Sequence, residues 1–371
     1  MHIFLDILRG IVAIVIAYTV VFVAALVNIW FERRFLAFMQ DRLGPNRTGW
    51  QGVLQSVADA FKMMGKEDFA PAQVDRVIFT LGPIMVMIGA VAVQLVIPYT
   101  KGWTGQDLNV GIIYIVAVTS FTVLAVLLGG WASHNKYSLV GALRSAAQMV
   151  SYEVPMILAL LVVAMGTGSL SLNAVVSAQH GYRWFFFIMP FTFFLFYVSS
   201  IAELNRGPFD LPEAESELVA GYSTEYSGMR FGMFFLNEYA GLTIMSMVTV
   251  TLFFGGWEGP GANLLVVHGI ALIPFIWFMV KVYVLVFVLV WIRLTIPRLQ
   301  VDQLMGFAWK ILIPLGLFNI GASGAIMLWV PNWRLGMAIF QWVFFLGFVL
   351  LFDPVLRWRL RRRRQRLAVT A

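Results

Sequence analysis

Long apolar segments recur along this chain, and they constrain its fold more than any other feature. A helix that crosses a bilayer needs about 20 apolar residues, and its backbone polar groups must be satisfied internally. The expected spans are 10–31, 77–98, 111–131, 151–167, 184–202, 238–256, 268–292, 309–330 and 336–352. The sequence therefore predicts an all-α polytopic integral membrane protein with about nine transmembrane helices.

The composition agrees with this class, because 60% of the residues are hydrophobic and only 12% are charged. The first apolar segment is too long for the core of a signal peptide, and no small-residue cleavage site follows it. We therefore expect it to be a retained helix. No internal repeat, soluble domain or low-complexity linker is evident, so residues 1–371 are predicted to form a single membrane domain.

The positions of lysine and arginine predict the orientation of the spans. With the N-terminus outside, the outer side and the spans carry few of the 26 basic residues, namely Arg9, Lys101, Arg183, Arg334 and Lys281. All the others fall in the inner-face loops 32–76, 132–150, 203–237 and 293–310 and in the basic C-terminal tail 354–371. Because cytoplasmic loops are the basic ones, we predict the N-terminus out and the C-terminus in.

The residue content of the chain excludes several kinds of chemistry. The chain has no cysteine, so it offers no ligands for thiolate-bound zinc or cysteine-ligated iron–sulfur clusters. None of its four histidines lies deep in a predicted span, and no metal site or catalytic residue is expected on this chain. The net charge of +7 does not indicate nucleic acid binding, because the basic run RWRLRRRR directly follows an apolar segment. Such a tail is typical of a topology anchor that contacts anionic lipid.

The first inner loop contains more than anchoring arginines. Gln40, Asp41 and Arg42 precede a Gly-Pro-Asn turn, and a helix is expected over about residues 51–66. Its polar stripe and its opposite apolar stripe have helical spacing; the polar one comprises Gln51, Gln55, Asp59, Lys62 and Lys66. This pattern is typical of an amphipathic helix lying on the bilayer surface. It also fits the wall of a cavity for a molecule with a lipid-like tail and a polar head.

Acidic residues dominate the third inner loop. Asp210 and Glu213 have the spacing of a capping box, and Asp210, Glu213 and Glu217 would share one face of the helix that follows. Acids so placed repel each other, which favours shared protons near neutral pH. A solvated acidic face would explain the run, and so would a chain of carboxylates entering the membrane between Glu203 and Glu225.

Two further charged residues belong to predicted spans. Glu153 lies in the first turn of the fourth span, where it fits a group that snorkels to the surface or a member of a proton relay. Lys281 lies near the middle of the seventh span, where an unpaired charge is costly. We expect it to have a carboxylate partner or to face water.

Four stretches together resemble one known family. They are ERRFLAFMQDRLGPNRTGWQGVLQSVADAFKMMGKED, GWASHNKYSLVGALRSAAQMVSYE, AELNRGPFDLPEAESELVAGYSTEYSGMRF and RLTIPRLQVDQLMGFAWK, between Glu32 and Lys310. They are similar, in the same order and spacing, to the membrane subunit at the heel of respiratory complex I. That protein is known as the H subunit in bacterial NADH-quinone oxidoreductase and as subunit 1 in mitochondria.

The resemblance implies a function and a set of site residues. A member of this family encloses the tunnel for ubiquinone or menaquinone and starts the proton path into the membrane arm. The quinone-binding residues that it implies here are Arg34, Gln40, Arg42, Asp59, Lys62 and Arg144. The implied proton path comprises Glu153, Glu203, Asp210, Glu213, Glu215, Glu217 and Glu225, to which we add Lys281.

The resemblance also implies partners and a location. The expected partners are peripheral iron–sulfur subunits at the inner face, small membrane subunits, antiporter-like subunits, quinone and membrane lipids. Quinone is the expected substrate, and the iron–sulfur clusters and flavin are expected on partner subunits, with no cofactor bound by this chain. The expected location is the bacterial inner (plasma) membrane, as a multi-pass protein.

Three other interpretations remain open from the sequence. The chain could be the similar subunit of a membrane-bound hydrogenase or ferredoxin-dependent complex, which differs in its electron donor. It could be a free-standing ion transporter, which predicts coupling residues deep in the spans and often an inverted repeat. It could also be a structural anchor, for which loss of the acids impairs assembly and nothing more.

Overall fold

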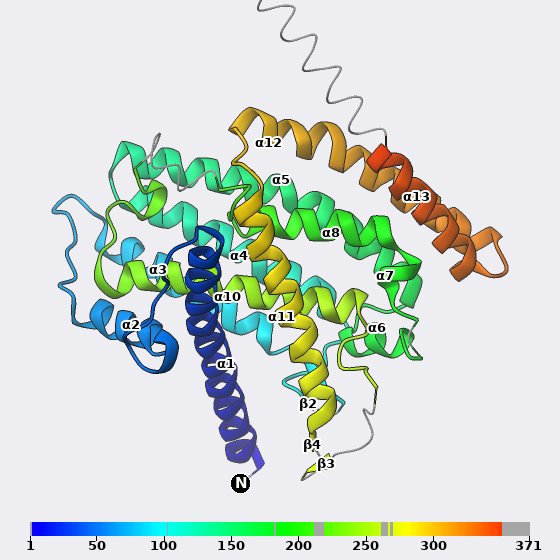
Figure 1. Cartoon of the computed structure of the whole chain (residues 1–371), viewed down its shortest axis with the longest axis horizontal. Coiled ribbons are helices and arrows are strands. Elements are labelled where there is room, and N and C mark those ends of the chain that lie inside the picture. The colour runs from blue at the N-terminus through cyan, green and yellow to red at the C-terminus, as the bar shows by residue number, and fades with distance from the viewer. Residues whose placement is uncertain are drawn as a thin grey trace, which may run out of the picture.

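The structure, a computed structural model, describes residues 2–101, 103–181, 183–210, 219–260, 266–267 and 270–350. The described chain is mostly helical (Figure 1). The helices are α1 His2–Met39, α2 Gln55–Gly65, α3 Arg76–Gln94, α4 Gly111–Ala132, α5 Lys136–Thr167, α6 Leu172–Ala178, α7 Phe185–Ile188, α8 Pro190–Glu203, α10 Gly228–Phe253, α11 Leu272–Thr295, α12 Val301–Phe307, α13 Ile313–Trp329 and a last helix Trp333–Leu350. Short turns of 3₁₀-helix lie at Trp50–Gly52 and Gly221–Ser223. Two small antiparallel hairpins pair β1 Pro98–Thr100 with β2 Trp103–Thr104, and β3 Val266–Val267 with β4 Ile270–Ala271.

Seven helices among the described residues are long and apolar enough to cross a membrane. They are Arg76–Gln94, Gly111–Ala132, Lys136–Thr167, Gly228–Phe253, Ile273–Thr295, Val301–Trp329 and Trp333–Leu350. In addition, α1 covers the first predicted span, and α8 is a shorter apolar helix within the fifth. The predicted fold class, an all-α polytopic membrane protein, is confirmed, while the count of nine spans and the orientation stay predictions.

Helix α10 is the centre of the bundle. In its most apolar window 72% of the residues are buried, against 22% for Val301–Trp329 and 11% for Trp333–Leu350. It packs against α1, α3 and α11, while α3, α4, α5 and α8 pack in series and α13 runs along α5 (Figure 1). Residues on α10 are therefore positioned by several neighbours at once, whereas the C-terminal helices expose most of their apolar surface.

The predicted inner loop 132–150 is wrong in its secondary structure, because α5 begins at Lys136 and runs through it. Asn135 caps the helix, since its side chain accepts a hydrogen bond from the Tyr137 N–H at 2.8 Å. No proline interrupts residues 136–150, so the helix continues into the predicted span 151–167. Arg144 and Glu153 consequently lie on one continuous helix.

Two other span boundaries differ from the sequence prediction. The predicted span 184–202 is divided into α7 and α8 because Pro190 can begin a helix but cannot continue one. Helix α10 begins at Gly228, well before the predicted start of its span at residue 238, so Glu238, predicted as the first residue of the span, lies inside the helix. Charge marked the end of the span in the sequence, but here the charge is paired inside the bundle.

The eighth span contains a local irregularity. Residues Ala308–Leu312 form a turn of π-helix between α12 and α13, directly before Pro314. A proline removes one helical hydrogen bond, and a wider turn accommodates its ring. The next turn of the chain falls at Pro331-Asn332, where the last two helices meet.

The predicted surface helix over residues 51–66 is observed as α2, which begins four residues later. Gln51 and Gly52 have positive φ angles of 52° and 75°, so regular helix cannot begin there. A Cβ atom on Gly52 would lie 2.3 Å from the Pro45 carbonyl oxygen, which explains why glycine occupies this position. The packed turn holds α2 against the end of α1.

Candidate functional site

A buried ionic network joins four segments at the end of the bundle where α1 ends and α10 begins. Glu32 at the end of α1 accepts hydrogen bonds from Arg206, with Nη1 2.7 Å from Oε2, and from Arg293 of α11. Arg206 also pairs with Glu238 of α10 at 3.6 Å, and its guanidinium lies 3.8 Å from the ring centroid of Tyr239. Glu32 and Arg206 are only 4% and 5% exposed, so both charges depend on these partners.

Arg206 remains a fixed positive charge in this network. Burial alone would lower the pKa of its guanidinium, but Glu32, Tyr239 and Glu238 outweigh burial and raise that pKa above its ordinary value. The Nε atom of Arg206 is buried and has no hydrogen-bond partner among the described residues. The site therefore contains a permanent cation between two carboxylates that belong to different helices.

Two predicted proton-path residues, Glu153 and Glu203, lie together between α4, α5 and α8. Ser120 of α4 donates a hydrogen bond to Glu153, and Thr119 of the same helix bonds Glu203. The two carboxylates are close enough to interact electrostatically. Glu203 is 6% exposed and its Oε2 has no partner among the described residues. An unsatisfied, buried carboxylate oxygen is a group that can accept a proton or a water molecule.

A cavity of about 80 Å³ opens beside Glu203, and we call it the polar cavity because two carboxylates and several other polar side chains interrupt its mainly apolar lining. Its lining includes Thr119, Asn205, Asn237 and Glu238, which lie on several elements. A cavity of this volume with several polar groups has room for a few water molecules. Tyr222 also lines the cavity, with its hydroxyl 3.4 Å from Oε1 of Glu238. Glu203 and Glu238 thus face one polar space.

A second cavity, of about 50 Å³ and almost wholly apolar, lies between α1, α2 and α10. Its apolar lining is Phe22, Leu26, Ile29, Ala60, Met63, Met64, Met229, Phe235 and Leu236. Arg33 and Asp59 stand at the same cavity as an ion pair with Nη1 2.5 Å from Oδ2, and Lys62 lies 3.8 Å from Asp59. The amphipathic helix α2 is therefore the wall of a cavity that combines an apolar interior with a charged edge.

The two cavities lie on opposite sides of α10. Met229, Phe235 and Leu236 line the apolar cavity, whereas Phe234, Asn237 and Glu238 line the polar one. The ionic network spans the same helix, because Arg206 contacts Glu238 and Tyr239 while Glu32 lies on α1 beside Arg33. Glu238 of this network thus lines the polar cavity, while Glu32 is the chain neighbour of Arg33, which lines the apolar one.

The other predicted quinone residues are not gathered at this cavity. Arg34 donates a hydrogen bond to the Gln51 carbonyl at 2.7 Å, and Gln40 accepts one from Arg42 at 2.7 Å, in the exposed segment just beyond α1. Arg144 lies half-buried on α5. Of the six predicted residues, only Asp59 lines the apolar cavity, and Lys62 contacts Asp59 at 3.8 Å. Arg33, which was not among the predicted site residues, lines the cavity with Asp59.

The acidic third inner loop, which we call the acidic connector, is described only in part. Asp210 is 4% exposed and accepts a hydrogen bond from Arg298 at 2.9 Å, and Glu225 accepts one from Asn135 at 2.6 Å. Glu213, Glu215 and Glu217 lie outside the described residues, and so do the capping box and the shared acidic face that the sequence predicts. The described ends of the connector are thus attached to the segment that follows α11 and to the start of α5.

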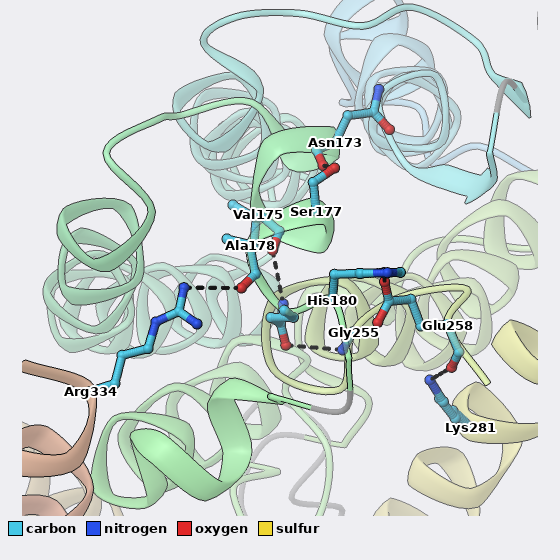
Figure 2. Close-up of polar contacts among 10 residues, drawn as sticks. Asn173, Val175, Ser177, Ala178, His180, Gly255, Glu258, Lys281 and Arg334 are labelled. Atoms are coloured by element: carbon cyan, nitrogen blue, oxygen red, sulfur yellow. Dashed lines mark hydrogen bonds and ion pairs between the residues drawn. The ribbon is translucent and has the colours of Figure 1, made fainter. Parts of the chain in front are cut away.

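Lys281 of α11 lies far from these groups, near the C-terminal end of α10. Its ammonium donates to the carbonyl oxygens of Phe254, Gly256 and Glu258 at 2.8, 3.1 and 2.5 Å, and it lies 4.7 Å from the Trp184 ring centroid. Figure 2 shows Lys281 beside the segment of Gly255 and Glu258, while the Glu258 carboxylate pairs with His180. The hydrogen-bond partners of Lys281 are backbone carbonyls, and the Glu258 carboxylate also attracts its charge, so the carboxylate partner expected from the sequence is present.

Comparison with known proteins identifies the family. The sequence profile of the NADH dehydrogenase family matches residues 11–324. The H subunit of NADH-quinone oxidoreductase from Dehalococcoides mccartyi is 44% identical over 343 residues, which cover 92% of this chain and 94% of that protein. The corresponding protein of Brevibacillus brevis is 48% identical over 317 residues, covering 85% and 93%. The chain belongs to the family of NADH-quinone oxidoreductase H subunits.

Membership of this family places the chain in an oxidoreductase complex of the respiratory chain, complex I. A further relative, the second H subunit of Geobacter sulfurreducens, is 45% identical over 326 residues, which cover 85% of this chain and 96% of that protein. The resemblance found in the four sequence stretches is therefore confirmed. Since each of these relatives is named as a subunit of NADH-quinone oxidoreductase, other complex I subunits are implied as partners.

Sequence reasoning missed the buried ionic network of this complex I subunit. None of Glu32, Arg206 and Arg293 was among the predicted site residues. Their pairing joins residues far apart in the chain, so no local pattern reveals it. The available signal was position, because each charge directly follows an apolar segment where a partner reduces the cost of burial.

Proposed function

We propose that this chain binds the quinone of its complex in the apolar cavity between α1, α2 and α10. The cavity lining accommodates an isoprenoid tail, since it is almost wholly apolar. The ion pair of Arg33 and Asp59 at its edge offers a donor and an acceptor for the polar head. Arg34, Gln40, Arg42, Lys62 and Arg144 serve the same head group as it moves beyond the cavity towards the redox partner.

Reduction of quinone is coupled to proton movement through the ionic network. When charge develops near Arg33 and Glu32, the relative strength of the attraction of Arg206 to Glu32 and to Glu238 changes. Glu238 and Glu203 share the polar cavity, so the proton affinity of both carboxylates responds. The observation that carries this proposal is the position of α10, which has an apolar cavity on one side and a carboxylate cavity on the other.

The proton path follows from the same arrangement. Protons enter by the acidic connector with Asp210, Glu213, Glu215, Glu217 and Glu225 and reach Glu238 and Glu203. Glu153 receives them next, because it interacts directly with Glu203. The path continues into membrane subunits packed beside α4 and α5. Lys281 is outside this path, since its ammonium is bound by carbonyl groups at the opposite end of α10.

The partners and location follow from this role. Electrons come from iron–sulfur clusters and a flavin on peripheral subunits that dock at the inner face, since this chain has no cysteine to hold a cluster. The chain joins that peripheral arm to the membrane arm of small and antiporter-like subunits. Its location is the bacterial inner membrane, with the N-terminus out and the C-terminus in.

Photoaffinity labelling tests the binding proposal. Membranes that contain the complex are treated with a quinone whose tail carries a photoreactive group, and the labelled peptides of this chain are identified. Labels on α1, α2 and the start of α10, reduced by excess natural quinone, support the proposal. Labels confined to α3, α4 or α13 contradict it, because those helices do not line the apolar cavity.

A purification from native membranes tests the partner proposal. Recovery of the tagged chain with iron–sulfur subunits and a flavin subunit that oxidises NADH supports it. Recovery of iron–sulfur subunits without that flavin subunit would instead indicate a ferredoxin- or hydrogen-linked donor. A chain recovered alone would contradict the coupling mechanism, which needs an electron donor.

A further inference from the structure

One buried amide holds both ends of the turn that carries Glu203 and Arg206. Gln148 of α5 is fully buried, and its Nε2 donates to the Ala202 carbonyl at 2.7 Å and to the Phe209 carbonyl at 2.6 Å. Both partners are acceptors, so the amide must present its NH₂ group to them. These two carbonyls bracket residues 203–208, which connect the end of α8 with Phe209.

The same turn has a second attachment to α5. Asn205 donates through Nδ2 to the Ser145 hydroxyl at 2.9 Å, and Ser145 lies about one helical turn from Gln148. The ring of Phe209 packs against Tyr152, one further turn along α5, at 5.7 Å between centroids. One face of α5 therefore fixes the start, the middle and the end of the turn.

Position matters for the two charged residues in this turn. Glu203 faces the polar cavity with one unsatisfied oxygen, and Arg206 lies between Glu32 and Glu238. Glu203 is the last residue of α8 and Arg206 follows it outside regular helix, so their placement depends on what holds the turn. The Gln148 amide bonds a long helix to both ends of that turn.

We propose that Gln148 is a positioning residue that sets Glu203 and Arg206 for proton transfer. This inference rests on the proposed function of the carboxylate cavity and deepens it. Gln148 lies on α5 between Arg144, proposed for quinone, and Glu153, proposed for the proton path. A small shift of α5 at its quinone end moves the turn through this amide, which makes α5 a mechanical link between the two sites.

The test compares Gln148→Met with the wild-type complex in inverted membrane vesicles. Methionine matches the length of glutamine and removes both hydrogen bonds. The equilibrium constant that favours the native position of the turn over displaced positions should fall by about tenfold. The amount of assembled complex in each vesicle preparation is matched by measuring NADH oxidation with an artificial electron acceptor. We expect quinone reduction to persist in part while protons translocated per quinone reduced fall and the pH profile of turnover shifts.

Gln179 provides a matched control. Like Gln148, it is a fully buried glutamine whose Nε2 donates to carbonyls, those of Thr251 and Leu252 at 3.1 Å each. It differs in position, because it follows the end of α6 and lies at the other end of α10. We expect Gln179→Met to lower the amount of assembled complex and to leave protons per quinone unchanged. If both variants change only the amount of complex, Gln148 is structural and the inference is wrong.

A second variant keeps the inference testable if Gln148→Met does not assemble. In Gln148→Glu, the new carboxyl can donate one hydrogen bond when protonated and repels both carbonyls when ionised. Protons translocated per quinone should therefore fall as the pH is raised, relative to wild type. A ratio that follows wild type at every pH overturns the inference.

Glu203→Gln in the same vesicles distinguishes failure of the carboxylate path from failure of the positioning role of Gln148. If Glu203→Gln leaves proton translocation intact, the proposed carboxylate path fails, whatever the Gln148 variants do. If Glu203→Gln abolishes translocation while the Gln148 variants pump as wild type, only the positioning role fails.

Discussion

Glu32 and Arg206 form a buried ion pair, with Oε2 2.7 Å from Nη1, that joins the end of α1 to the turn after α8. Arg293 of α11 binds the other oxygen of Glu32. Three segments distant in sequence are therefore held by one carboxylate. Because α1 also lines the apolar cavity, this pair connects the wall of that cavity with the turn that bears Glu203.

Removal of both partners of this pair should cost less stability than the two single removals added together. Arg206→Met leaves Glu32 with a buried charge that only Arg293 compensates, so we expect a loss of about 3–5 kcal/mol in stability. The double variant Arg206→Met, Glu32→Gln should lose less than the sum of the single variants. The measurement is the temperature at which the solubilised complex dissociates.

The exposed Arg183 supplies the control for that experiment. Arg183→Met should leave the dissociation temperature nearly unchanged, because an exposed arginine contributes little. Additive losses in the Arg206 and Glu32 double variant would show that the two residues do not interact, contrary to the structure.

Asp59→Asn should weaken quinone binding without loss of assembly. The Arg33–Asp59 pair is partly exposed, so its contribution to stability is small. Its loss changes the polar edge of the apolar cavity, and we expect the KM for quinone to rise by about threefold to tenfold. Lys62→Gln, at the looser 3.8 Å contact, should have a smaller effect. A KM unchanged in Asp59→Asn would exclude this edge as the site of the head group.

Lys281→Met distinguishes an anchor from a proton carrier. The substitution leaves three carbonyl oxygens at the end of α10 without their donor, and each buried, unpaired group costs about 1–3 kcal/mol. We expect less assembled complex, and normal proton translocation per quinone in the complex that does assemble. Loss of translocation in assembled complex would return Lys281 to the proton path that the sequence suggested.

Gln341→Leu should loosen the last helix. Gln341 is fully buried; its Oε1 accepts from the Thr192 N–H at 3.0 Å, and its Nε2 donates to Asn319 at 2.7 Å, so it joins three helices. Loss of these bonds should destabilise the complex by about 1–3 kcal/mol, measured as a lower dissociation temperature. Val343→Leu, at a position 66% exposed on the same helix, should change nothing. An unchanged temperature for Gln341→Leu would contradict the contact.

The sequence predicted the spans well where apolar runs end at polar residues. It placed the start of one helix too late where a charge is paired inside the bundle, since Glu238, the first residue of the predicted span, lies inside α10 and its partner Arg206 comes from another segment. It also indicated a loop over 132–150, because polar residues such as Arg144 suggested a surface connection, although nothing there interrupts helix.

The candidate site was predictable in its residue types more than in its contacts. Glu153 and Glu203 were found as carboxylates at span ends, and the structure brings them together through α4. Asp59 was found through the amphipathic period of α2, but its partner Arg33 depends on how α1 and α2 pack. No sequence pattern identified Gln148, since a buried glutamine that binds two carbonyls cannot be distinguished in the sequence from any other polar residue on a helix.

Proton translocation by the Glu203→Gln complex shows whether Glu203 carries protons. The measurement is the number of protons moved per quinone reduced in inverted vesicles, with NADH as donor and with assembly matched by an artificial acceptor. Glutamine keeps the shape of the side chain but cannot carry a proton, so the account predicts a near-complete loss of translocation in assembled complex. Translocation per quinone equal to wild type would contradict it.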